Sequence, residues 1–301
     1  MIFDKTADQR ILRGATASLT VTLRNQDGDP ADAGGTLTVQ VQKADGTDLL
    51  AAGSSTTNPA GTGNYTRSLT AAQTASTETL TATWTDGGDS STRVTVHEIV
   101  GGFYFSVGDA RLFDPTQLRS ERYNNDRLIE ARRQVEDEFE RICNVAFVPR
   151  FRRARLSGNG QTCIMFDDPM VRTVRTVRVY DSATTYSTFT SAQLAALGGE
   201  NMRRGLVERL DGNTWTWGES NIVVEYEHGF DRPPEPVRQA AFRRVVQMLS
   251  LAKSAIPFNA ISYTPDTGVT YRLSTPSDRR TGDPEIDAVL ARHSFNYPGI
   301  G

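Results

Sequence analysis

The stretch from Asn125 to Asp181 constrains the fold most, because its hydrophobic pattern changes there from the period of a helix to that of a strand. In its first part, apolar residues recur every three or four positions, which places them on one stripe of a helix capped by Asn125 or Asp126 and ending near Cys143. The stripe consists of Leu128, Ala131, Val135, Phe139 and Ile142. An arginine-rich strand, a turn and a strand of alternating Val and Arg follow. The segment therefore predicts a small module that packs one apolar face inward and directs arginines outward.

Residues 1–100 are predicted to form an immunoglobulin-like β-sandwich. Thr, Ser or Arg alternates with Leu or Val in several short segments, which is typical of strands with one buried face. These segments are residues 18–23, 36–41, 64–69, 79–85 and 92–100. Turn signals such as Asp45-Gly46 separate them, and strands at this spacing favour a sandwich in which Trp84 and Tyr65 anchor the core. Gly101-Gly102 marks the boundary to a second domain, residues 101–301.

The second domain is predicted to be α+β, with two long helices and short hairpins. The second long helix follows a Pro cluster and ends near Ser254. Hairpins are expected across 151–166, around 211–213 and across 261–273, and further strands at 171–179 and 222–226. Asp283 caps a terminal helix, with Pro284 in its first turn. A length of 301 residues suits two domains of ordinary size.

Composition argues against several classes of protein. The formal net charge of −3 implies no general affinity for nucleic acid. The start of the chain contains no apolar segment of the signal-peptide kind, and the apolar runs are too short to span a bilayer. Nearly all positive charge is arginine, which forms bidentate, weakly hydrated pairs suited to protein interfaces.

No catalytic or metal-binding pattern is found, so we expect no enzyme activity, no cofactor and no metal. His97, His228 and His293 fall in different predicted elements and have no nucleophile or carboxylate at a recognised spacing. Asp167-Asp168 before Pro169 is interpreted as a turn rather than a metal-binding pair. The two cysteines, Cys143 and Cys163, give no disulfide framework and are interpreted as buried thiols.

The order of elements resembles that of the head-to-tail adaptor (connector) proteins of long-tailed bacteriophages. Three segments carry the resemblance: the helix from Leu128-Ile129-Glu130-Ala131-Arg132 to Cys143-Asn144, the strand Phe166-Asp167-Asp168-Pro169-Met170-Val171 with Val174 and Val177, and the closing Gly282-Asp283-Pro284-Glu285-Ile286-Asp287-Ala288-Val289-Leu290-Ala291-Arg292. The resemblance covers roughly residues 107–295. The β domain in front is an addition found only in some members of the family.

The resemblance implies a structural virion protein, present in the host cytoplasm during assembly, that forms a dodecameric ring. Such a ring binds the portal protein above and a stopper or tail-completion protein below, and genomic DNA passes through its lumen without sequence-specific binding. A neighbouring neck component of similar construction fits the same pattern. The long segment between Tyr180 and Val224 departs from the family pattern, as does the β domain.

Three groups of residues are predicted to make the contacts of this ring. Contact with the portal is expected from the terminal helix and tail: Asp283, Ile286, Val289, Leu290, Arg292, Phe295 and Tyr297. Contact between subunits is expected from Arg132, Arg133, Arg150, Arg152, Arg153, Arg155, Arg172 and Arg175, for which salt bridges are favoured over contact with DNA. A hairpin with Tyr263, Asp266 and Tyr271 is expected to face the lumen or a ring neighbour.

The alternative is a decoration or adhesin protein whose β domain binds a host surface or glycan. Trp84, Tyr65 and Tyr104 are the residues available for an aromatic platform, although burial explains the first two better. The two hypotheses differ in assembly, because an adaptor forms a ring with a portal and an adhesin binds cells without one.

Overall fold

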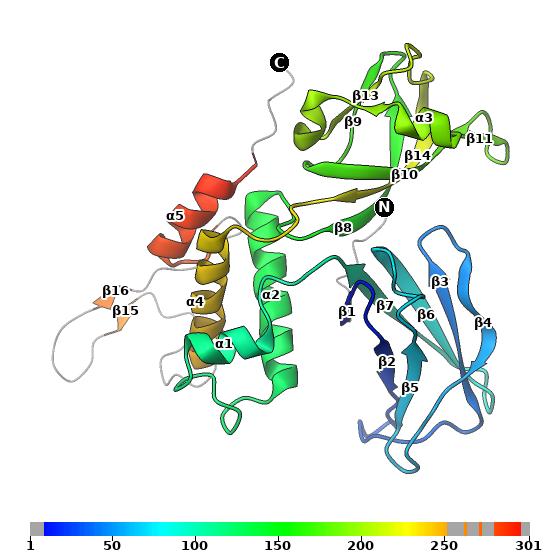
Figure 1. Cartoon of the computed structure of the whole chain (residues 1–301). Helices are drawn as coiled ribbons and strands as arrows, with labels where there is room; N and C mark the ends of the chain where they lie inside the picture. Colours follow the sequence, from blue (N-terminus) through cyan, green and yellow to red (C-terminus); the bar gives the residue numbers. More distant parts are fainter. Residues whose placement is uncertain (1–8, 252–261, 264–270, 273–279, 296–301) are drawn as a thin grey trace.

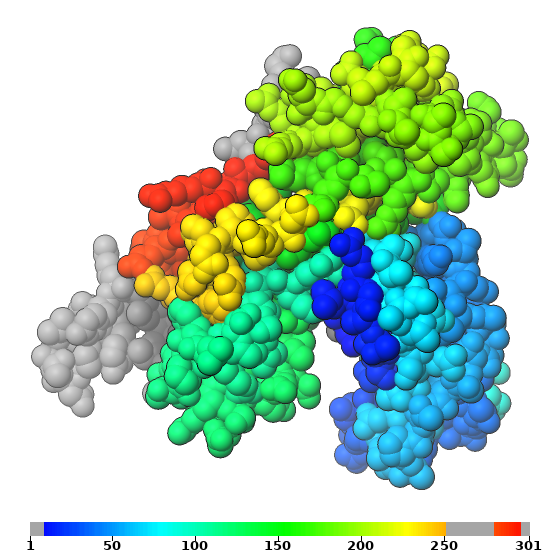
Figure 2. Space-filling model, in the orientation of Figure 1, coloured from blue at the N-terminus to red at the C-terminus, as the bar shows by residue number. Residues whose placement is uncertain are grey.

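A computed structural model describes residues 9–251, 262–263, 271–272 and 280–295. The chain has an N-terminal part made of strands and a second part in which a layer of helices lies beside two small sheets (Figure 1). The fold is therefore mixed α+β. The two parts meet at one end of the N-terminal part, and their opposite ends lie apart (Figure 2).

The N-terminal part consists of two sheets that face each other. Its strands are β1 (Gln9–Leu12), β2 (Ala17–Thr22), β3 (Leu37–Lys43), β4 (Asp48–Ser55), β5 (Asn64–Leu69), β6 (Glu78–Asp86) and β7 (Thr92–Val100). One sheet has the order β1-β7-β6-β3-β4, in which β1 and β7 are parallel, and β2 pairs with β5 in the other. Leu19 and Leu69 from the small sheet and Val39 and Trp84 from the large one are almost fully buried in one core. The sequence pattern does not predict β1 or β4.

Four helices of the second part share a hydrophobic core. They are α1 (Val107–Phe113), α2 (Asn125–Cys143), α4 (Glu235–Leu251) and α5 (Pro284–His293). The side chain of Asn124 accepts a hydrogen bond from the Arg127 amide at 2.9 Å, so the cap of α2 lies one residue before the predicted position. The predicted cap of α5 is confirmed, because Asp283 accepts from the Glu285 amide at 2.8 Å.

The remaining strands form two small sheets around a second core. They are β8 (Arg150–Gly158), β9 (Cys163–Met165), β10 (Val171–Tyr180), β11 (Tyr186–Thr188), β12 (Leu197–Gly198), β13 (Leu206–Arg209) and β14 (Gly218–His228), with α3 (Ser191–Ala195) and the 3-10 helix η1 (Glu200–Arg204). The sheet orders are β11-β10-β14-β8 and β12-β13-β9. Phe166, Trp215 and Tyr226 are fully buried between these sheets.

Two predicted hairpins are wrong. Strand β8 pairs with β14, whereas β9 pairs with β13 in the other sheet. The Asn159 side chain donates to the Cys163 carbonyl at 2.9 Å, which supports a turn between the two sheets rather than within one. Residues 215–217 form no strand, because the Trp215 amide donates to the Gln161 carbonyl at 2.8 Å instead of pairing with β13. Where a hairpin is predicted across 261–273, β15 (Ser262–Tyr263) pairs with β16 (Tyr271–Arg272).

Candidate functional site: an ion-pair network between the two parts

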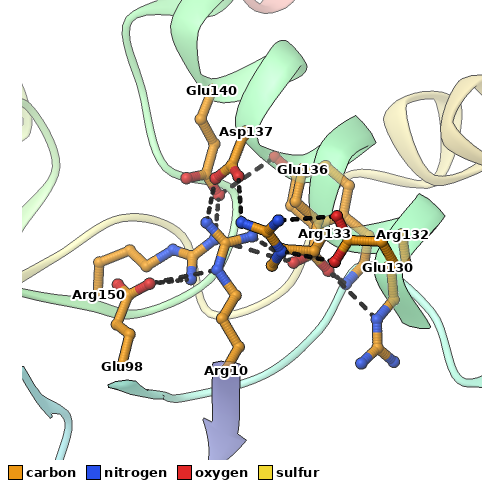
Figure 3. Close-up of polar contacts among 10 residues, drawn as sticks. Arg10, Glu98, Glu130, Arg132, Arg133, Glu136, Asp137, Glu140 and Arg150 are labelled. Carbon is orange, nitrogen blue, oxygen red and sulfur yellow. Dashed lines mark hydrogen bonds and ion pairs between the residues drawn. The ribbon is translucent and has the colours of Figure 1, made fainter. Parts of the chain in front are cut away.

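Arg10 and Arg150 form the centre of a buried ion-pair network that joins the two parts of the chain (Figure 3). Arg10 extends from β1, and its guanidinium contacts Glu98 at 3.2 Å on β7 and Glu136 at 2.7 Å on α2. Arg10 also pairs with Asp137. Arg150, at the start of β8, contacts Glu98 at 3.0 Å and Glu140 at 2.9 Å. Arg10 therefore links the N-terminal part to helix α2. Arg150 links β8 to both the N-terminal part and α2.

Backbone and aromatic groups complete the bonding of the carboxylates. The Tyr104 amide donates to Glu136 at 3.0 Å, and the Tyr104 hydroxyl donates to Glu140 at 3.3 Å. Arg132 lies over the Phe103 ring at 3.7 Å and donates to the Phe105 carbonyl at 2.9 Å. The segment that connects the two parts is therefore held by the same residues that pair across them.

Burial and charge act in opposite directions on these groups. Arg150 is 3% exposed and Glu136 is 1% exposed. Burial by itself would lower the pKa of Arg150, but the carboxylates of Glu140, Glu98 and Glu136 outweigh it and raise that pKa. Burial raises the pKa of Glu140 against the opposing effect of Arg150 and Arg10. Buried charges of this kind are tolerated only when paired, so the network stabilises one arrangement of the two parts.

Glu227 on β14 is a second meeting point of the two parts. Its carboxylate contacts Arg172 at 3.0 Å and Arg175 at 3.1 Å on β10, and Arg13 of the N-terminal part at 3.3 Å. The Thr77 hydroxyl of the N-terminal part donates to the same carboxylate at 3.0 Å. The Glu227 carboxylate thus accepts bonds from both parts while the residue is only 6% exposed.

A third set of contacts lies beside the turn between β3 and β4. Arg153 donates to the Ala44 carbonyl at 2.7 Å, and Arg178 lies 3.8 Å from Asp45. Three separate contacts fix three points of the N-terminal part on the second part. We call the residues of these three sets of contacts the joint, because a rotation of one part about any one set would break the other two.

Most of the arginines predicted to contact a neighbouring subunit are engaged within the chain. Arg132 and Arg150 are buried, and Arg153, Arg172 and Arg175 belong to the joint. Of the others, Arg133 pairs with Glu130 at 2.8 Å, and Arg152 lies 3.8 Å from Asp167. Arg155 is exposed and lies over the Tyr180 ring at 5.1 Å.

The residues predicted to contact the portal are divided between core and surface. Ile286 and Leu290 are buried against α2 and α4, and Val289 and Phe295 pack against the same core. Arg292 is exposed. Tyr297 lies outside the described residues. In the predicted ring hairpin, Tyr263 pairs with Tyr271 in the ladder of β15 and β16, whereas Asp266 lies outside the described residues.

The three aromatic residues considered for a surface platform are buried. Trp84 is 0% exposed, Tyr104 1% and Tyr65 6%. Trp84 donates to the Thr95 hydroxyl at 2.9 Å inside the N-terminal core. A platform of these three side chains is therefore not available to a ligand.

The described residues hold no group of three or more His, Cys, Asp or Glu arranged to bind a metal ion. His97 and His228 are buried in separate places, and His293 packs its ring against Phe147. Asp168 accepts a hydrogen bond from the Tyr226 hydroxyl at 2.6 Å. No helix in the described part of the chain is long and apolar enough to cross a membrane.

Sequence reasoning did not identify the carboxylates of the joint, which are Glu98, Glu136, Glu140 and Glu227. A signal was present for Glu136 and for Arg132, its partner on the same helix. Arg132 and Glu136 are four positions apart and each follows a residue of the apolar stripe, so both fall within the wide face that a core helix buries. Nothing local in the sequence links this helix to Arg10 or Glu98.

No model of a known protein family matches the chain, and no curated protein is significantly similar to it. Among solved structures, the chain is similar to one described as "Neck of empty GTA particle computed with C6 symmetry", with a TM-score of 0.46 and 16% identity over 66% of this chain and 93% of that one. A second, "Virion of native gene transfer agent (GTA) particle", has a TM-score of 0.46 and 14% identity over the same shares. Likeness at this level does not identify a fold or a function.

Proposed function

We propose that the chain is a structural virion protein of the head-to-tail adaptor type, which forms a dodecameric ring between the portal and the tail-proximal neck proteins. The observation that carries this proposal is the packing of the first and last resembling segments, 128–144 and 282–292, in the helical core, which Met170 of the middle segment, 166–177, also contacts. Their separation in the sequence gives no local reason for them to meet.

Specific contacts hold these segments together. The Cys143 thiol, at the end of α2, lies 3.5 Å from the Leu290 carbonyl of α5, to which it donates. The Phe295 amide donates to the Cys143 carbonyl at 2.7 Å. Met170, from the middle segment, packs against the same core, and its carbonyl accepts from Gly229 at 3.0 Å. The first and last segments that suggest the adaptor family thus pack together, and the middle segment contacts them through Met170, while its Phe166, Val171 and Val177 belong to the core of the two small sheets.

The N-terminal part is proposed to be an immunoglobulin-like domain. In chain order, its second and fifth strands form one sheet, and its third, sixth and seventh form the other, as the B, E, C, F and G strands do in that fold. The contacts of the joint are proposed to hold this domain in the same orientation in every copy of the chain. In a ring of such chains, the β domains would occupy equivalent positions around the ring axis.

The net charge of the chain fits a ring through which DNA passes better than a ring that binds DNA. Twelve chains of formal charge −3 give about −36 in total, which disfavours binding to phosphates. The arginines of the joint pair with carboxylates inside the chain, so they are not presented to a nucleic acid. Genomic DNA is proposed to pass through the ring without sequence-specific contact.

The experiment is assembly with the portal protein from the same genome, measured by co-sedimentation. Truncation after Thr281 is a poor test, since it removes the buried Ile286 and Leu290 and so damages the core. Better variants are Arg292→Glu on the exposed side of α5, and deletion of residues 296–301. The matched control is Arg204→Glu, an exposed arginine on η1.

We expect both α5-end variants to weaken portal binding about tenfold, as loss of a contact worth about 1.4 kcal/mol does, and the control to bind normally. Wild-type binding by all three variants would place the portal contact elsewhere on the chain. A wild-type chain that never binds the portal would contradict the adaptor function and favour a decoration or adhesin protein.

A further inference from the structure

The two parts of the chain have separate hydrophobic cores. The core of the N-terminal part lies within residues 11–99, whereas the two cores of the second part contain only residues from Tyr104 onward. Next to the joint, three apolar residues are buried outside these cores: Val100, Phe151 and Val223. Each part therefore has a core of its own, which the contact between the parts does not complete.

Ion pairs and hydrogen bonds make the contacts of the joint. Besides the pairs of the buried network, Arg153 donates to the Ala44 carbonyl at 2.7 Å, and Arg175 donates to the Thr77 hydroxyl at 2.6 Å. When charged and polar groups separate, water solvates each of them, which offsets most of the attraction that is lost. Separation of the two parts therefore exposes mainly groups that water can solvate, unlike the opening of a hydrophobic core.

Two adjacent glycines, Gly101 and Gly102, connect the last strand of the N-terminal part to the second part. Glycine adopts more backbone conformations than any other residue, so this is the point where the chain turns most easily once the contacts of the joint separate. The parts meet at one end of the N-terminal part, and their opposite ends lie apart (Figure 2). A turn at the two glycines therefore has only the joint to open.

The docked arrangement of the two parts requires glycine at position 101. The Gly101 amide donates to the Pro149 carbonyl at 2.8 Å, and a Cβ atom at position 101 would lie 2.5 Å from Cβ and 2.6 Å from Cγ of the stiff Pro149 ring. A Cβ atom on Gly102 would meet Val148 Cγ1 at an ordinary 3.7 Å. Neither glycine has a positive φ, so alanine strains neither backbone. Alanine at 101 therefore opposes docking, and alanine at 102 is its matched control.

We propose that the N-terminal part is a hinged unit, which separates from the second part about Gly101 and Gly102 while both parts stay folded. The docked arrangement is the favoured one, and the three sets of contacts open together, because a rotation about one set breaks the other two. A partner that binds the open form shifts the population toward it. This device goes beyond the adaptor function and does not depend on it.

Hydrogen exchange of the full chain in low concentrations of urea tests whether the parts separate before they unfold. A peptide that contains Gly101 reports on the joint, since the Gly101 amide is bonded to Pro149 across it. Peptides around Trp84 and Phe139 report on the cores of the two parts. The Gly101 peptide is expected to exchange through an opening that leaves both core peptides protected. Exchange of all three peptides in a single transition would overturn the hinged unit.

The glycine variants test the hinge directly. Gly101→Ala is expected to speed exchange of the linker peptide about tenfold or more, as overpacking of a close contact does, and to leave both core peptides at their wild-type rates. Gly102→Ala is expected to exchange like the wild type. A wild-type linker rate in Gly101→Ala would overturn the proposal. Faster exchange of the core peptides in that variant would also overturn it, because position 101 would then support the whole fold.

A distance between the parts distinguishes their separation from a local adjustment at Pro149. Pulsed electron paramagnetic resonance measures it between spin labels on Ala52→Cys and Ser187→Cys, two exposed sites on β4 and β11, in a Cys163→Ser chain. The otherwise unchanged chain and Gly102→Ala are expected to give one distance, and Gly101→Ala a second population at longer distance. A single unchanged distance in Gly101→Ala would overturn the hinged unit, since the faster exchange would then be local.

Discussion

Replacement of Arg150 by Met is expected to lower the free energy of unfolding by about 3 kcal/mol. Arg150 is 3% exposed, and it contacts Glu98 at 3.0 Å and Glu140 at 2.9 Å. Removing one partner of a buried ion pair costs roughly 3–5 kcal/mol, because it leaves a buried charge unpaired. The lower end applies here, because Arg10 still pairs with Glu98 and Glu136. Glu140 retains only the Tyr104 hydroxyl among the contacts described above.

Urea denaturation followed by circular dichroism measures this loss, and the corresponding fall in Tm is roughly 5–10 °C. Arg155→Met is the matched control, since Arg155 is an exposed arginine on the same strand, and its effect is expected within about 0.5 kcal/mol. The double variant Arg150→Met/Glu140→Gln is expected to recover part of the loss, because it removes the charge left unpaired. An Arg150→Met protein within about 0.5 kcal/mol of the control would refute the buried network as a source of stability.

The deficit of Arg150→Met is also expected to depend on pH. Burial raises the pKa of Glu140 above its ordinary value of 4.5. A raised pKa in the folded state favours folding below the ordinary value, and that contribution is lost as the pH rises through the folded pKa. Loss of Arg150 raises this pKa further, so the deficit is expected to be largest at neutral pH and to shrink as the pH falls toward 5. A deficit that is constant across this range would assign the effect to packing rather than charge.

Three further predictions concern single groups. Burial lowers the pKa of His228 below 6.5. The contribution of His228 to stability is therefore present above pH 6.5 and is lost as the pH falls through the pKa of the folded state. The His228→Gln variant is expected to show a flatter pH profile of the denaturation midpoint in this range. Burial raises the pKa of the Cys143 thiol to about 11. A thiol reagent at pH 8 is therefore expected to label Cys163 first and Cys143 only in denaturant. Rapid labelling of Cys143 in the native protein would contradict its burial. Asp283→Ala removes the cap of α5 and is expected to cost about 1 kcal/mol, seen as faster amide hydrogen exchange at the start of that helix, whereas Asp283→Asn retains protection.

Local sequence patterns predicted two kinds of element. One kind has its interaction partners nearby in the sequence, and the other has an apolar face that is clearly separated from a polar face. The stripe from Leu128 to Ile142 and the Asp283-Pro284 start of α5 are encoded within a few residues each, so their chemistry is visible without the fold. Strand β4 carries no alternation of buried and exposed residues, because it lies at the edge of its sheet, and the pattern that marks a strand is missing.

Long-range pairing could not be predicted in the same way. The choice of β14 rather than β9 as the partner of β8 joins residues sixty or more positions apart, and no local signal fixes it. The joint is a similar case. Arg150 was predicted to contact a neighbouring subunit, whereas it is buried within the chain. Its burial depends on Glu98 and Glu140, which come from other elements.

Electron microscopy of the purified chain mixed with the portal protein from the same genome tests the central claim most directly. Class averages are expected to show a twelvefold ring seated on the portal, with a β domain held at one fixed position on each subunit. Such images locate the N-terminal part and the ring contact in one measurement. Portal particles without added density, beside a chain that stays monomeric, would contradict the adaptor function.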